Sequence, residues 1–158
     1  QSPVVYSHVC PHALNPHPRN KTDEQIRAVV ERGGLAGITL LPWFLNADGV
    51  ASLDDYLIAI EHMIDVAGEE SIGIGTDFMQ GYGIEFLTWL RRDKGVGRLL
   101  APMPDPDAAL VAAPSGLERI ATLPALTAGM ESRGWSSQRI ERVLGLNWLR
   151  LFGDVWKN

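Results

Sequence analysis

Short apolar runs alternate with amphipathic segments along the first half of this chain. The runs are rich in valine, isoleucine and leucine, as in buried strands, and they lie at residues 2–8, 35–42 and 71–77. The amphipathic segments repeat apolar positions at helical spacing and lie at residues 22–34 and 52–68. Because strands and helices alternate with short links, the pattern predicts a parallel α/β sheet, in which ligands bind beyond the carboxyl ends of the strands.

Both of these predicted helices begin with a recognisable cap. Thr22 and Gln25 stand at the start of the first helix, and Ser52 and Asp55 stand at the start of the second. A hydroxyl followed three positions later by a side chain that can accept a hydrogen bond is the capping-box pattern. Gly68 then marks the end of the second helix, because glycine is the usual residue just beyond a helix.

The last third of the chain also reads as helical. The pattern predicts helices at residues 83–92, 123–134 and 135–156. A proline-rich stretch at residues 101–116 separates the first of these from the others and predicts a loop. No internal repeat is evident, so residues 1–158 are interpreted as one domain segment.

Composition narrows the class of partner. The chain has 158 residues, 46% of them hydrophobic, and a net charge of −5 without any basic run, which argues against nucleic acid and anionic membranes. No apolar run approaches the roughly 20 residues of a membrane helix, and the N-terminus lacks the layout of a signal peptide. The single Cys10 forms no internal disulfide, which suits a reducing compartment. We therefore expect a cytoplasmic protein with a small-molecule or protein partner.

Residues 4–20 concentrate ligand chemistry in a stretch that cannot be a helix. His8, His12 and His17 could form a metal cluster, but intervening prolines break the helical spacing that usually aligns two histidines. A second hypothesis makes Cys10 a nucleophile activated by His8 or His12, although no third orienting group is evident. A third is a rigid polar loop without chemistry.

A resemblance that covers the whole chain bears on these alternatives. The segment "SHVCPHALNPHPRNKTDEQIRAVVERGGLAGI" resembles the C-terminal barrel segment of the membrane dipeptidase (renal dipeptidase) family, the M19 metallopeptidases. His8 and Arg19, the latter within "HPRN", match the family's spacing, and Asp77 matches the aspartate of its glycine-rich last strand in "GIGTDF". The ending "GLERIATLPALTAGMESRGWSSQRIERVLGLNWLRLF" resembles the family's closing helices. One departure is Met79 in "DFMQG", where many members have a second carboxylate.

The resemblance implies a (β/α)8 TIM barrel, a fold of about 250 residues. Only three of its strands are recognisable here, so the chain resembles the last three β/α units and the C-terminal helices. The N-terminal half of the barrel, from the same or a separate chain, would then be a partner, and a homodimer is a further assembly to consider. The family's His-x-Asp pair, its bridging Glu and a further His ligand would lie in that half.

The activity that the resemblance implies is zinc-dependent hydrolysis of a dipeptide substrate at a site with two zinc ions. His8 would bind one zinc ion, Arg19 would hold the terminal carboxylate of the substrate, and Asp77 would move a proton from water to the leaving amine. His12 and His17 would be loop residues rather than ligands. We expect this segment to be inactive by itself.

Other interpretations of the same residues remain. The barrel could belong to another metal-dependent amide or lactone hydrolase, or the chain could be a non-catalytic partial barrel that pairs with another chain through its open sheet edges. Without the resemblance, Arg19 would read as a surface ion-pairing residue and Asp77 as a helix N-cap.

Overall fold

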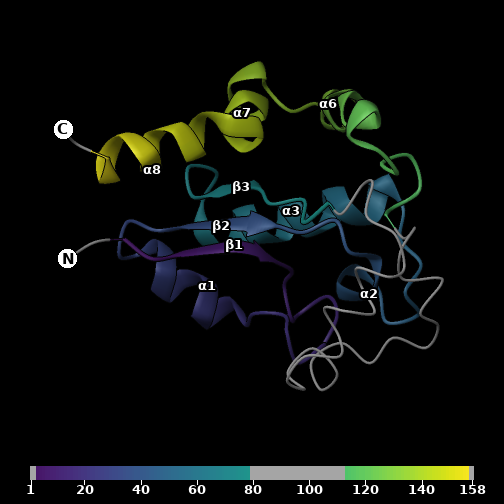
Figure 1. The fold of residues 1–158 in the computed structure, drawn as a ribbon, viewed down its shortest axis with the longest axis horizontal. Coiled ribbons are helices and arrows are strands. Elements are labelled where there is room, and N and C mark those ends of the chain that lie inside the picture. Colours follow the sequence, from purple (N-terminus) through teal and green to yellow (C-terminus); the bar gives the residue numbers. More distant parts are fainter. Residues whose placement is uncertain (1–2, 79–112, 157–158) are drawn as a thin grey trace.

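The computed structural model describes residues 3–78 and 113–156, and it confirms the predicted parallel sheet (Figure 1). The three strands are β1 (Val5–Val9), β2 (Leu35–Ile38) and β3 (Ile72–Ile74), hydrogen-bonded in the order β1-β2-β3. Both pairings are parallel, so the carboxyl ends of all three strands lie at one edge of the sheet.

Two crossover helices connect the strands, α1 (Asp23–Val30) and α3 (Leu53–Ala67). Both predicted capping boxes are present. The hydroxyl of each cap residue accepts a hydrogen bond from the backbone amide three residues later, and the side chain of that later residue accepts one from the backbone amide of the cap residue. The helices pack beside each other and against the sheet. The hydrophobic core fills the space between them and includes these fully buried side chains: Ile26, Ile38, Tyr56, Ile60, Met63 and Ile72.

The link after β2 differs from the prediction. The second strand was expected at residues 35–42, but it ends at Ile38, and a short helix, α2 (Pro42–Leu45), follows. Proline is favoured at the first turn of a helix because its missing N–H has no partner there. The apolar residues of α2 include Phe44 and Leu45, both buried, so hydrophobicity alone did not distinguish this turn from the end of a strand.

The C-terminal third is helical, as predicted, but the last helix is not regular. It is interrupted by a π-helical segment, η3 (Arg142–Leu146), between α7 (Ser137–Glu141) and α8 (Asn147–Val155). A 3₁₀ turn and a helix precede it, η2 (Ile120–Thr122) and α6 (Pro124–Ser132). In the described part of the chain, no helix has the length and apolar character needed to cross a bilayer. The helix predicted at residues 83–92, most of the connection at 101–116, and Met79 lie outside the described residues.

The start of α8 covers the outer edge of β3. The Asn147 side-chain amide donates to the carbonyl oxygens of Glu69 and Ile72, each at 2.7 Å, and the Trp148 indole N–H donates to the Ile74 carbonyl at 3.0 Å. The Ile72 and Ile74 carbonyls face away from β2, since the neighbouring Ser71 carbonyl is the one bonded to Ala36 of that strand. Side chains of α8 therefore satisfy backbone acceptors of β3 that pair with no described strand.

Gly73 makes room for this contact, and its replacement by alanine is expected to destabilise the protein. A Cβ at Gly73 would lie 2.5 Å from Nε1 of Trp148, whose indole is fixed by its hydrogen bond to Ile74. Overpacking of this kind costs about 1–3 kcal/mol. Urea unfolding measures the change. Gly153→Ala on α8 is the control, because nothing lies within 4 Å of a Cβ there. Equal stability of Gly73→Ala and the unaltered protein would contradict the packing described.

Candidate functional site

His8 lies near the carboxyl end of β1 and is half-buried. Its Nδ1 shares a hydrogen bond of 2.7 Å with the hydroxyl of Ser7. A partner on one ring nitrogen fixes the orientation of an imidazole and directs the other nitrogen towards further ligands. No residue in the described part of the chain bonds Nε2 of His8, so this nitrogen is available for a ligand.

The loop after β1 returns along the strand and brings Arg19 next to it. Two backbone hydrogen bonds close the loop: the Lys21 amide donates to the Cys10 carbonyl at 3.0 Å, and the His12 amide donates to the Lys21 carbonyl at 2.8 Å. The loop is stiffened by its prolines, which fix φ and remove donors. Arg19 therefore occupies a defined position beside β1 rather than a mobile surface position.

Two buried asparagines anchor this loop to α2, and sequence reasoning missed both. The Asn20 side-chain amide donates to the carbonyl oxygens of Asn15 and Phe44, each at 2.8 Å. The Asn15 side-chain amide donates to the Trp43 carbonyl at 3.0 Å. Both asparagines are 5% exposed. Two asparagines among prolines were the available signal, since such side chains often bond loop backbone, but the sequence does not specify the partners.

His8 and Arg19 line the same solvent-open hollow, which we call the β1 depression. Its volume is about 310 Å³, and it is lined by residues 5–9 of β1 together with Arg19 and Lys21. The structure thus brings two of the three predicted site residues together. Lys21, which was not predicted, adds a second cation, and its Nζ lies 5.5 Å from the centroid of the Tyr6 ring. A hollow with two cations and one imidazole suits an anionic group of a ligand.

Asp77 follows β3, so it lies at the carboxyl ends of the strands, as His8 does, but it does not line the β1 depression. The strand ends are nevertheless close, because a Cβ on Gly75 would overlap the Ser7 carbonyl oxygen. Asp77 is exposed and has φ 55°, the left-handed region that few residues other than glycine, asparagine and aspartate adopt. Its carboxylate bonds no side chain or backbone group within residues 3–78 and 113–156.

The other candidate ligands of this loop do not join His8. Cys10 is fully buried and its Sγ donates to the Thr39 carbonyl at 3.6 Å. Burial raises the pKa of the Cys10 thiol far above its usual value, so the thiolate needed for nucleophilic attack does not form near neutral pH. His17 packs instead on Phe44, with ring centroids 4.8 Å apart. Burial, followed by the Arg19 charge, lowers the pKa of His17 and favours its neutral form.

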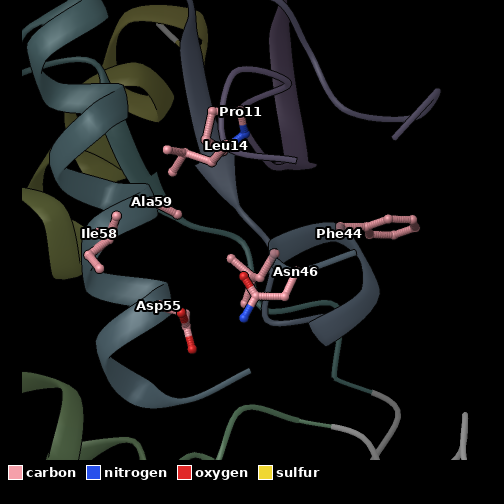
Figure 2. Close-up of a pocket in the computed structure, with 8 residues that line it drawn as sticks. Pro11, Leu14, Phe44, Asn46, Asp55, Ile58 and Ala59 are labelled. Atoms are coloured by element: carbon pink, nitrogen blue, oxygen red, sulfur yellow. The ribbon is translucent and has the colours of Figure 1, made fainter. Parts of the chain in front are cut away.

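A second pocket lies between α2 and α3 (Figure 2). Its volume is about 150 Å³, and most of its lining is apolar, including Leu14, Ile58 and Ala59. Its one carboxylate, Asp55, is engaged in the capping box of α3, and the hydrogen bond from Ser52 is the main reason that the pKa of Asp55 is lowered. The pocket is therefore too small to hold a substrate, and it has too few free polar groups to orient one.

The residues described do not by themselves form a metal centre. Stable zinc sites use three or four protein ligands, whereas no group of three or more His, Cys, Asp and Glu side chains within residues 3–78 and 113–156 could hold an ion. His8 is a single imidazole with one ring nitrogen available. The described residues therefore fit a metal site to which they contribute one ligand, His8, and other residues contribute the rest.

Solved structures resemble this fold over nearly the whole chain. An amidohydrolase from Pseudomonas aeruginosa matches 99% of the chain with TM-score 0.87 and 39% identity, and the match covers 46% of that protein. A metallo peptidase from Rhodobacter sphaeroides, liganded with a phosphinate mimic of the dipeptide L-Ala-D-Ala, matches 99% of the chain with TM-score 0.74 and 27% identity, over 37% of its length. The strands and helices described here are therefore part of a TIM-barrel metallohydrolase fold.

The sequence comparison identifies the family. The profile of the membrane dipeptidase family, Peptidase family M19, matches residues 1–90 and 104–158, so the chain belongs to this family. Dipeptidase ataJ from Aspergillus terreus is 29% identical over 158 residues, which are 98% of this chain and 31% of that protein. The chain thus spans less than half the length of these three relatives. The resemblance predicted from the sequence motifs is confirmed.

Proposed function

We propose that this chain is part of a zinc-dependent dipeptidase and contributes three residues to its active site. His8 binds a metal ion, Arg19 binds the terminal carboxylate of the dipeptide, and Asp77 transfers a proton. The observation that carries the proposal is the β1 depression, a hollow along β1 that both His8 and Arg19 line. His8 lies near the carboxyl end of this strand, and barrel enzymes bind substrate at the carboxyl ends of their strands. The dipeptidases and the dipeptide-mimic complex among its relatives support the choice of substrate.

Arg19 suits a carboxylate because its guanidinium presents paired N–H donors in a plane. Such a fork binds both oxygens of a carboxylate at once, which fixes orientation as well as charge. Arg19 forms no ion pair with a carboxylate in the described part of the chain. Its donors therefore remain available to a substrate.

Asp77 suits proton transfer because it is exposed at the strand edge without a competing bond to a described residue. The carboxylate accepts a proton as a water oxygen attacks the scissile carbonyl carbon, and it returns that proton to the amine nitrogen when the C–N bond breaks. The positive φ of Asp77 places this residue in a left-handed backbone conformation that aspartate tolerates.

The remaining strands and metal ligands come from residues outside those described, in the same chain or another. We use the term assembled enzyme for this chain together with those residues. Within residues 3–78 and 113–156, His8 is the one metal ligand that we propose, and we therefore expect no turnover of dipeptides by the segment alone. A second candidate is hydrolysis of a non-peptide amide, which is favoured by the 39% identity to a protein named as an amidohydrolase.

The metal content of His8→Ala tests the proposal. The assembled enzyme is expected to bind two zinc ions, and removal of one imidazole ligand is expected to reduce the bound zinc after dialysis by about one equivalent. His12→Ala is the matched control, since His12 is a half-buried histidine of the loop that follows β1 and is not proposed as a ligand. Elemental analysis measures both variants. Full zinc content in His8→Ala, or equal loss in His12→Ala, would contradict the assignment of His8.

A further inference from the structure

The guanidinium of Arg19 lies over a buried aromatic ring. Its central carbon is 5.1 Å from the centroid of the Phe44 ring, and Phe44 is 2% exposed. The His17 ring packs on the same phenyl ring at an interplanar angle of 60°. Figure 2 shows the Phe44 ring projecting from α2 away from the other labelled side chains of the small pocket. The ring therefore supports the loop of Arg19 and does not fill that pocket.

Hydrogen bonds hold the backbone on both sides of this contact, and one of them joins the two segments. The Asn20 side chain, next to Arg19, donates to the backbone carbonyl of Phe44 at 2.8 Å. The amide of Arg19 donates to Nδ1 of His17 at 3.1 Å, and the amide of Phe44 donates to the Leu41 carbonyl at 3.0 Å. The bond from Asn20 to the Phe44 carbonyl joins the loop to α2, so it holds the residue next to Arg19 against the segment that carries the ring.

We propose that Phe44 is a positioning residue for Arg19 and prepares it to bind the substrate carboxylate. This inference rests on the proposed role of Arg19. An aromatic ring attracts a guanidinium through its face, and this contact leaves the N–H edge of the guanidinium free for hydrogen bonds. A flexible arginine would lose side-chain freedom on binding, whereas a guanidinium already held on a ring loses less. Phe44 thus acts on substrate affinity through Arg19 without touching the substrate.

Phe44 is also part of the hydrophobic core, so the test separates positioning from packing. In the assembled enzyme, Phe44→Leu keeps an apolar side chain but removes the ring. It is expected to raise KM for an unblocked dipeptide by about 3- to 30-fold, the range of a cation–π contact, with kcat within about twofold. For the same dipeptide with an amidated C-terminus, KM is expected to change less than about twofold, because no carboxylate is present. Phe44→Tyr, which keeps an aromatic ring, is expected to have nearly the KM of the unaltered enzyme.

Trp135→Leu is the matched control. It removes the ring beneath Arg139, at 5.7 Å, on the C-terminal helices and is expected to leave both KM values unchanged. Melting temperatures of all variants report the loss of packing separately from the change in KM. If Phe44→Leu does not fold, Phe44→Met is used, because its unbranched side chain fills the space of the ring more flexibly.

A double variant decides between the two roles of Phe44. In an Arg19→Met background, Phe44→Leu is expected to add nothing to KM, because the cation that the ring holds is absent. An additive rise in KM, or an equal rise for the free and amidated dipeptides, would overturn the inference and leave Phe44 as a packing residue. If Arg19→Met itself affects both substrates equally, the proposed role of Arg19 fails, and the positioning role of Phe44 fails with it.

Discussion

Replacement of Asp77 by asparagine is expected to lower kcat of the assembled enzyme by about 10²- to 10⁴-fold, the usual contribution of a general acid and base. Asparagine keeps the shape of the side chain but cannot accept and return a proton. It also tolerates the left-handed backbone that Asp77 adopts at φ 55°, so the folded state is expected to be retained. Steady-state kinetics, melting temperature and bound zinc are measured on the same preparation.

Asp65→Asn is the control for this experiment. Asp65 is an exposed carboxylate on α3, so its replacement makes the same change of charge away from the strand edge. We expect normal turnover in this variant. Near-normal turnover in Asp77→Asn would remove Asp77 from the mechanism, and a loss of stability parallel to the loss of activity would assign it a structural role.

Arg19→Lys is expected to lower kcat/KM for unblocked dipeptides, by less than the roughly 10- to 150-fold that complete loss of a charge-assisted pair would cause. The substitution keeps the positive charge but replaces the planar fork by a single ammonium, and it weakens a charge-assisted pair worth about 1.5–3 kcal/mol. Lysine also stacks less well on the Phe44 ring that holds the guanidinium. Kinetics on a dipeptide and on its C-terminally amidated form measure the effect, which we expect mainly for the free acid.

Arg27→Lys makes the same substitution on the exposed side of α1 and is expected to leave both rates unchanged. An equal loss of kcat/KM for the free and amidated substrates in Arg19→Lys would show that Arg19 supports the loop and does not bind the carboxylate.

The local elements were predictable because their signals lie within a few residues of each other. Thr22 with Gln25 and Ser52 with Asp55 define helix starts through hydrogen bonds across one turn, and both capping boxes are present. The short helix α2 was missed because an apolar segment of this length fits a strand end as well as a helical turn.

The long-range contacts were not predictable. The donation from Trp148 to the Ile74 carbonyl joins residues 74 positions apart, and nothing at either position specifies the other. The site shows the same division. The proposed roles of His8 and Arg19 follow from a family resemblance carried by local motifs. The Phe44 ring beneath Arg19 belongs to α2 instead, and the residue whose side chain bonds the Phe44 carbonyl, Asn20, lies 24 positions earlier.

The central claim is that this chain completes a metal-dependent dipeptidase site that it does not form alone. Release of free amino acids from an unblocked dipeptide tests this claim most directly, measured for the zinc-loaded assembled enzyme, for the same enzyme after chelation, and for the 158-residue chain alone. We expect turnover in the zinc-loaded assembled enzyme and none in the other two samples. Turnover by the chain alone, or equal turnover after the metal has been removed, would contradict the account.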